Sequence, residues 1–385
     1  MSQERKRILE MVQEGKLSAQ EAIILLDALD GKSDVKASTQ DSATTSTPVE
    51  ETTQEEASTG KQEETNKNSE KKDSDSFYSQ LESAGERIFD FVNNAFKKIK
   101  DIDLQFNQSL DVPHTFQQDG SEIERIDIDV ANGPVRIVGW DQQDVRVECD
   151  AKVYRSDDRE SARNYFLENT VFSVDNGLLI FGTQSKWMKV ETVVYVPKKQ
   201  YKKLSIRIFH GGISAEGMDA DYVTLKTTNG KVDITRINGE KIDIETVNGQ
   251  VNVKQSQANK LEIETVNGTI DLPTGVYQDI DVKTFNGNIN TILPSSGTRK
   301  IEAKVVTGNI YLDIPRSVSI NGEVSSNLGS YKLDLHDINV MHEKREVIQK
   351  QVSFRRTGLG EEVIYVIADT KTGTVQVRDI DVQGE

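Results

Sequence analysis

The chain has 385 residues, of which 35% are hydrophobic and 6% aromatic, a lean composition for a single globular body. Its formal net charge of −16 argues against nucleic acid as a partner, because phosphate backbones would repel it. Cys149 is the only cysteine, which excludes a disulfide framework and a thiolate zinc site within one chain.

The first residues, Met-Ser-Gln-Glu-Arg-Lys-Arg, lack the apolar stretch of a signal peptide. No apolar run in the sequence approaches the ~20 residues that a membrane helix needs. We therefore expect a soluble cytoplasmic protein, which could still lie peripherally at the inner face of the membrane.

A helical hairpin is predicted over residues 1–32. Gly15 is placed to end its first helix, Ser18 and Glu21 form a capping box for the second, and Gly31 is placed to end that one. About thirty residues cannot bury a self-sufficient core. We expect the hairpin to dock on a partner or on its own copy, the alternative being a weakly ordered tail. The expected contact residues are Ile8, Val12, Leu25, Leu26 and Leu29.

Residues 33–75 are almost entirely Ser, Thr, Gln, Glu, Lys and Asp, a composition that predicts a disordered linker. An amphipathic helix is predicted within residues 76–104: helical periodicity runs over residues 76–100, and Lys97, Lys98 and Lys100 suit its C-terminal end. Two roles are open for this amphipathic helix: contact with the membrane interface, or capping the open end of the following β-domain. Its apolar stripe consists of Phe77, Leu81, Ala84, Ile88, Val92, Ala95 and Ile99.

Strand patterns dominate residues 105–385, beginning with the alternation of Ile126 to Val130. A repeated phrase of Thr-Val-Asn-Gly type starts at Thr227 and recurs at intervals of 19 residues. Glycine-containing phrases at His210, Thr307 and Leu328 extend the series, the last two after intervals of 21. A fixed period near 20 predicts a solenoid whose rungs stack strand on strand. The fold class is therefore mostly β: a parallel β-solenoid preceded by the hairpin, the linker and the capping or amphipathic helix.

The repeated Asn-Gly pair is predicted to form one corner of each rung. We expect the asparagines to point inward and to bond to one another along the axis, and the glycines to supply positive φ. Asn-Gly is also the strongest hairpin signal, so a meander of hairpins competes with the solenoid. The second corner of each rung is less uniform, which favours the coil. The predicted corner residues are Asn229, Gly230, Asn248, Gly249, Asn267, Gly268, Asn286 and Gly287.

These repeats resemble the bacterial β-strand-repeat family of putative adhesins. The opening segment from Glu4 to Ala22 resembles the SHOCT-like helical domain of YvlB-like proteins of Gram-positive bacteria. The resemblance implies a right-handed parallel β-solenoid and an association with cell-envelope stress operons, which often encode phage-shock-protein-C-like membrane proteins. That family has no established catalytic residues to carry over. Its adhesin label fits this sequence poorly, because the sequence shows no export signal.

No catalytic constellation stands out in the sequence. The histidines are His114, His210, His336 and His342, and none is paired at metal-ligand spacing. We expect His210 to act as a corner residue, because it falls in the asparagine column. We therefore predict that the chain is not an enzyme and that it needs no cofactor or metal.

Two outward columns are candidate surfaces. Asp243, Glu262 and Asp281 should stack on one face, either as a solvated acidic wall or with calcium screening them. An apolar column could dock a partner strand or helix, or could lie under the N-terminal helix or the C-terminal strands. This docking strip consists of Val247, Val266, Phe285 and Val306.

Our main hypothesis is a non-enzymatic scaffold of the envelope stress response. The solenoid would present a rigid surface near the membrane, and the tethered hairpin would self-associate or bind a protein partner, for which a phage-shock-protein-C-like membrane protein is the candidate. An exported adhesin is the first alternative. A carbohydrate-active β-helix enzyme is the second, but its acids should cluster in a cleft rather than spread along columns.

Overall fold

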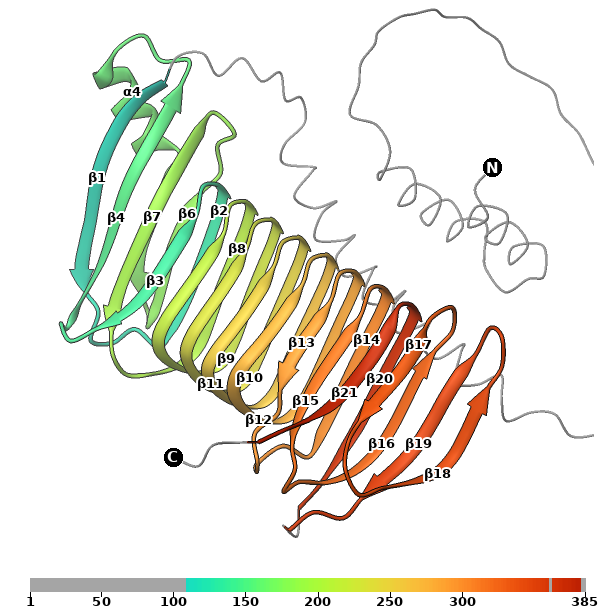
Figure 1. The fold of residues 1–385 in the computed structure, drawn as a ribbon. Helices are drawn as coiled ribbons and strands as arrows, with labels where there is room; N and C mark the ends of the chain where they lie inside the picture. The colour runs from blue at the N-terminus through green and yellow to red at the C-terminus, as the bar shows by residue number, and fades with distance from the viewer. Residues whose placement is uncertain (1–108, 360–361, 382–385) are drawn as a thin grey trace, which may run out of the picture. The chain divides into compact units, whose positions relative to one another are not determined.

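The computed structural model describes residues 109–359 and 362–381, which form a stack of β-rungs with one short helix (Figure 1). The predicted hairpin of residues 1–32, the linker of residues 33–75 and the helix of residues 76–104 lie outside the described residues. Within the described ranges, no helix is long and apolar enough to span a membrane.

The elements follow one another in three groups along the chain. The first group is β1 (Ser109–Asp119), β2 (Arg125–Asn132), β3 (Val135–Trp140), β4 (Asp144–Tyr154), α4 (Arg159–Glu168), β5 (Thr170–Asp175), β6 (Leu178–Thr183), β7 (Met188–Pro197) and β8 (Gln200–His210). The repeats form β9 (Ile213–Asn229), β10 (Val232–Asn248), β11 (Val251–Asn267), β12 (Ile270–Asn286) and β13 (Ile289–Ile292). The last group is β14 (Lys300–Thr307), β15 (Ile310–Pro315), β16 (Ser319–Ser326), β17 (Ser330–Asp334), β18 (Ile338–Arg345), β19 (Lys350–Arg356), β20 (Val363–Thr372) and β21 (Thr374–Ile380).

The predicted parallel solenoid is confirmed, and the meander of hairpins is wrong. β9, β10, β11 and β12 pair in parallel, and equivalent repeat positions lie directly opposite one another, as Ile242 does with Leu261. Each of these strands is 17 residues long and bends once. The bend places a short half-strand on one flat face of the solenoid and a longer half-strand on the other.

The bend uses a left-handed residue in three successive rungs, β9, β10 and β11. Arg236 and Gln255 have φ angles of 55° and 51°, and Gly217 fills the same position in β9 with a φ of 65°. This is the loosely patterned second corner of the sequence. It tolerates varied side chains because no neighbouring atom lies near the Cβ that Gly217 lacks.

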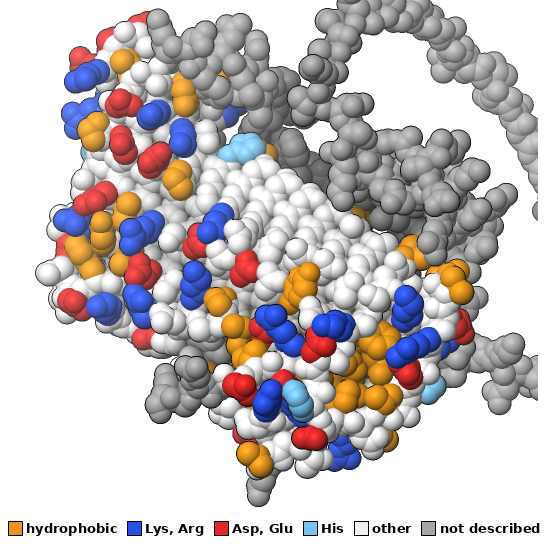
Figure 2. Space-filling view, viewed as in Figure 1, with side chains coloured by type: hydrophobic (Ala, Val, Ile, Leu, Met, Phe, Trp, Pro, Cys, Tyr) orange, Lys and Arg blue, Asp and Glu red, His pale blue; other side chains and the backbone are white. Residues whose placement is uncertain are grey.

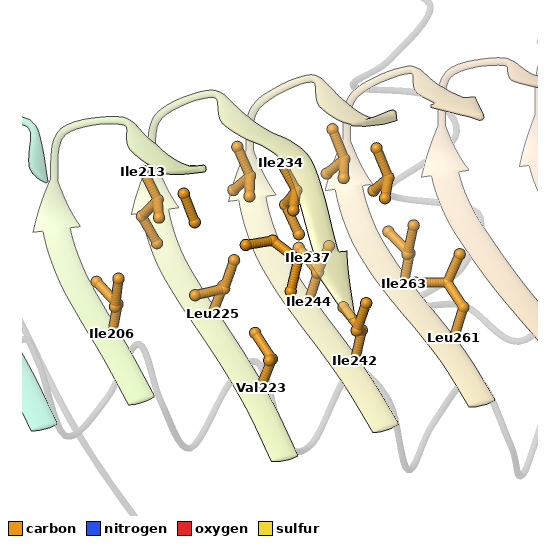
Figure 3. Packing of buried hydrophobic residues seen from close by; sticks show 14 of the residues in the cluster. Ile206, Ile213, Val223, Leu225, Ile234, Ile237, Ile242, Ile244, Leu261 and Ile263 are labelled. Carbon is orange, nitrogen blue, oxygen red and sulfur yellow. The ribbon is translucent and has the colours of Figure 1, made fainter. Parts of the chain in front are cut away.

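The core lies between the two flat faces. In β10, the inward side chains Val232, Ile234, Ile242 and Ile244 are fully buried, and Ile237 joins them from the bend. Figure 3 shows such residues from successive rungs pointing into one continuous interior. Alternation along each half-strand therefore produces the core, as expected for a sheet with one wet face.

At both ends of the stack, the order of the rungs in space differs from their order in the sequence. At the C-terminal end, β20 lies between β14 and β16, and β21 lies between β15 and β17. At the N-terminal end, β2 lies between β6 and β8, and β3 lies between β7 and β9. The expected direct step from Gly308 to Gly329 is therefore wrong, because Gly373 lies between them.

A buried ion pair fixes the inserted C-terminal rung. The Arg356 side chain donates to the carbonyl oxygens of Val318 at 3.0 Å and Pro315 at 2.7 Å, and it pairs with Asp379 at the end of β21. The backbone N–H of His336 also donates to Asp379, at 2.8 Å. These contacts tie the end of β19 to the β15–β16 connection and to β21, and they tie the segment between β17 and β18 to β21.

Each end of the stack is closed by antiparallel strands. At the N-terminal end, β1 and β4 extend one face, and β5 extends the other by pairing with β6. α4 packs against β1, β4 and β5, with Asp158 as its N-cap and with Ala162 and Phe166 buried. At the other end, β18 and β19 form a hairpin on β16, and a register shift in β18 interrupts the outermost edge.

Candidate functional site

The Asn-Gly corners stack so closely that only glycine fits there. A Cβ built on Gly249, Gly268 or Gly287 would lie 1.9 Å from the carbonyl oxygen of the preceding glycine in the column, and one built on Gly230 would lie 2.0 Å away. Positive φ was the expected reason and is wrong, because none of these four residues has a φ in the left-handed region. Contact between rungs is what requires glycine. In spatial order the column is Gly133, Gly211, Gly230, Gly249, Gly268, Gly287, Gly308, Gly373 and Gly329.

The threonine of the repeated phrase completes the corner. Its hydroxyl points inward and donates to the carbonyl oxygen of the glycine in the preceding rung, as Thr284 does to Gly268 at 3.0 Å. Thr370 makes the equivalent bond to Gly308 at 2.9 Å, and Ser326 makes it to Gly373 at 3.0 Å. A small hydroxyl residue at this position therefore gives the glycine carbonyl of the neighbouring rung a hydrogen-bond donor.

The asparagines form a ladder along the outside of the corner. The Asn248 amide donates to Asn229 at 2.9 Å, Asn267 to Asn248 at 2.8 Å and Asn286 to Asn267 at 3.0 Å. The ladder was expected to point inward, but Asn248 and Asn267 are exposed. At the N-terminal end of the ladder, the Asn229 side-chain amide lies 3.1 Å from the Nδ1 atom of His210 and bonds to it, so His210 lies in the asparagine column.

The apolar docking strip lies beside this ladder, and we name it the corner ridge. It consists of Val247, Val266, Phe285 and Val306, which occupy equivalent positions of successive rungs. All four are half-buried. None belongs to the buried core or to the partly buried residues packed against that core. The ridge is therefore an apolar row on the outer side of the corner.

The second surface is a charged face on the outer side of the longer half-strands. The acidic column of Asp243, Glu262 and Asp281 is present, but lysines from the same and neighbouring rungs separate its charges. Lys241 approaches Glu262 to 2.5 Å, and Lys283 lies 3.0 Å from Asp281. Among the described residues, no group of three or more His, Cys, Asp or Glu could hold a metal ion. Lysines therefore screen the acids of this face.

Several of these charged groups are largely shielded from water. The side chain of Glu245 is only 4% exposed and lies 2.8 Å from Lys226, and that of Lys283 is 14% exposed. Burial, together with the neighbouring Glu245, raises the pKa of Asp243. The charges of this face are thus engaged with one another, and Figure 2 shows no large area of a single sign on the visible side of the molecule.

Glu302 should make the stability of the solenoid depend on pH. Burial alone would raise its pKa, but hydrogen bonds from Lys300 and Lys304 outweigh burial and lower the pKa to about 2. Because the folded pKa lies below the unfolded one, this carboxylate stabilises the protein above about pH 4.5, and the contribution is lost as the pH falls toward 2. We expect Glu302→Gln to lower the free energy of unfolding most near pH 6 and least near pH 2.

Denaturant unfolding of both proteins across this pH range measures the difference. The matched control is Glu168→Gln, because Glu168 is exposed on α4. A difference between wild type and Glu302→Gln that stays constant with pH would contradict the assignment.

The structure does not unite every residue that the sequence singled out. His114 lies against Phe116 at the N-terminal end, and His336 bonds to Asp379 at the opposite end. The hairpin residues Ile8, Val12, Leu25, Leu26 and Leu29 lie outside the described residues. Sequence reasoning missed Arg356 as an inward residue, although alternation from Val352 and Phe354 places it on the buried side of β19.

Comparisons with known proteins identify two regions. A family model described as Toastrack DUF4097 matches residues 123–377, and a model described as a SHOCT-like domain matches residues 3–34. The uncharacterized protein YvlB of Bacillus subtilis is 38% identical over 380 residues, which cover 98% of this chain and 99% of that protein.

Solved structures show weaker similarity. A putative adhesin from Bacteroides fragilis is 14% identical, with a TM-score of 0.40, over 69% of this chain and 97% of that one. A structure called a putative lipid binding protein, from Parabacteroides distasonis, is 10% identical, with a TM-score of 0.35, over 68% of this chain and 96% of that one.

Proposed function

The chain belongs to the Toastrack DUF4097 family, and from this premise we propose that it is a non-enzymatic scaffold of the bacterial envelope stress response. The solenoid presents one long surface near the inner face of the membrane. The N-terminal hairpin binds a protein partner, for which a phage-shock-protein-C-like membrane protein is our candidate, or a second copy of the chain.

One observation carries the scaffold proposal: the outward polar side chains bond to their counterparts in adjacent rungs. Amides form the corner ladder, and Asn252 donates to Asp233 at 2.9 Å on the flat face of the short half-strands. Lysines engage the acids of the charged face, as with Lys226 and Glu245. Such a surface is rigid and preorganised, which favours binding because little side-chain entropy is lost on association.

The hairpin supplies the second contact. The match of the SHOCT-like model to residues 3–34 supports an independent module ahead of the solenoid. A flexible connection between two binding modules raises the effective concentration of the second contact once the first has formed. The two modules together would hold a partner more firmly than either would alone.

Replacing Leu25 and Leu29 by glutamate tests the proposal. We expect the double variant to lose self-association in light scattering, or partner recovery in co-purification from membranes, because charges would enter the apolar contact. Its circular dichroism in the β region should stay unchanged. Gln13→Glu with Gln20→Glu is the control, because it adds the same charge to polar positions of the hairpin.

The proposal fails if wild type is monomeric and the double variant keeps every partner. Fractionation into cytosol, membrane and surface pools separates the scaffold from an exported adhesin, for which the protein would be found at the surface.

A further inference from the structure

The corner ridge has the form of a docking surface for an apolar helix. Rungs of a parallel sheet are spaced at about 4.8 Å, so the ridge from Val247 to Val306 covers about 14 Å. Phe209 and Thr228 occupy the equivalent positions of the two preceding rungs, where both are buried, and with them the row is about 24 Å long. A straight row with this spacing suits side chains at positions i, i+3, i+4 and i+7 of a helix.

We propose that the corner ridge binds residues 77–99 of the same chain. The sequence of this segment carries an apolar stripe from Phe77 to Ile99 at helical spacing. As a helix, these residues would cover about 33 Å, which is enough to span the whole row. The segment would shield the ridge and leave the two flat faces of the solenoid open.

The entry point of the chain supports this occupant. β1 is antiparallel to β4, β4 is antiparallel to β7, and β7 is parallel to β3, which starts just after Gly133. Ser109 therefore lies at the same edge of the stack as the Asn-Gly corners, at the N-terminal end. Residues 100–108 can span up to about 30 Å when extended. That reach exceeds the distance across the sheet from β1 to β9, since the four inter-strand spacings along β1, β4, β7, β3 and β9 total about 19 Å.

The entry point of the chain also fixes the direction of the segment. Its C-terminal end must lie near β1, so its N-terminal half would lie over the later rungs. If Ile99 is level with Phe209, Glu86 and Glu82 come about 20 and 26 Å along the row. The rungs of Phe285 and Val306 lie about 19 and 24 Å along it. Lys283 and Lys304 lie on the same outer side of those two rungs, but Lys283 already pairs with Asp281 and the buried Lys304 with Glu302, so the register rests on chain geometry rather than on charge.

Disulfide trapping in the full chain tests the proposal. We pair Ile88→Cys with Val266→Cys, because the two positions should lie level with each other. The native Cys149 is buried, and burial raises the pKa of its thiol to about 12, so it should stay unreactive under mild oxidation. The control pair is Ile88→Cys with Lys254→Cys, since Lys254 is exposed on the opposite flat face.

We expect an intramolecular disulfide in the first pair, at a yield that does not depend on protein concentration, and little in the control. A disulfide-linked dimer that increases with concentration would identify a second copy as the occupant and overturn the proposal. Equal yields in the two pairs would also overturn it.

Hydrogen exchange provides a readout that needs no cross-link. Val266→Glu should speed the exchange of residues 77–99 by about tenfold, the factor that ~1.4 kcal/mol represents. Lys254→Glu should leave it unchanged, and an unchanged rate in both variants would contradict the docking. Neither experiment depends on partner capture by the hairpin, so the scaffold function and this contact can fail separately.

Discussion

Replacing Gly268 by alanine is expected to lower the free energy of unfolding by about 3 kcal/mol, the upper part of the range for overpacking a close contact. The new Cβ would lie 1.9 Å from the carbonyl oxygen of Gly249 and 2.7 Å from its carbonyl carbon. Both atoms belong to the backbone of the neighbouring rung, so no side chain can move aside. The rungs would have to separate at the corner, which also stretches the bond from the Gly249 N–H to Asn267.

Two matched variants isolate this steric effect. Gly217→Gln should cost only about 1 kcal/mol, because its Cβ position is open and Gln255 already occupies the equivalent left-handed position. Asn267→Ala should cost about 1 kcal/mol through the broken amide ladder. Urea unfolding of the three variants measures the differences. Similar destabilisation by Gly268→Ala and Gly217→Gln would show that close packing of the glycine column is not the reason for its glycines.

Ending the chain at residue 362 is expected to abolish cooperative folding of the C-terminal half of the stack. The cut removes β20 and β21, which lie between earlier rungs rather than at the end. β14 and β16 would lose a shared partner, and Arg356 would remain buried without Asp379. Loss of one partner from a buried ion pair alone costs about 3–5 kcal/mol.

An internal deletion provides the comparison. Removing residues 232–250 takes out one repeat of 19 residues and joins Lys231 to Val251 in the same register. We expect that shorter chain to melt cooperatively, with reduced stability, because β9 would stack on β11 as it stacks on β10. Thermal melting by circular dichroism and size-exclusion chromatography compare the two proteins. If the truncated chain and the chain with the internal deletion melt equally cooperatively, the place of the removed rung in the stack does not matter for folding, and the prediction is wrong.

The middle of the fold could be read from the sequence, whereas its ends could not. The period of 19 residues predicts both the parallel pairing and its register, because equivalent residues must stack in columns. No local sequence pattern predicts the insertion of β20 between β14 and β16. All rungs carry the same alternation of inward and outward residues, so a strand would fit beside any of several neighbours.

The corner shows a similar limit. The sequence identified Gly268 and its equivalents as structurally required, but it could not distinguish positive φ from close contact, since both demand glycine. The outer position of Asn267 was also missed, because the inward place is taken by the threonine two residues earlier. The helix α4 was also missed, although Asp158 as N-cap and the i, i+4 spacing of Ala162 and Phe166 are helix signals.

The Asn-Gly corners also bear on the chemical ageing of the chain. In an Asn-Gly pair, the backbone nitrogen of glycine can attack the asparagine side-chain carbonyl, which expels ammonia and leaves a succinimide. Here the N–H groups of Gly230, Gly249 and Gly268 each donate to the backbone carbonyl oxygen of the asparagine in the next rung at 3.0 Å. The amides that would be attacked are held in the ladder. Deamidation at each pair therefore requires its corner to open, so the positions of accumulated isoaspartate in an aged sample would record where the stack comes apart.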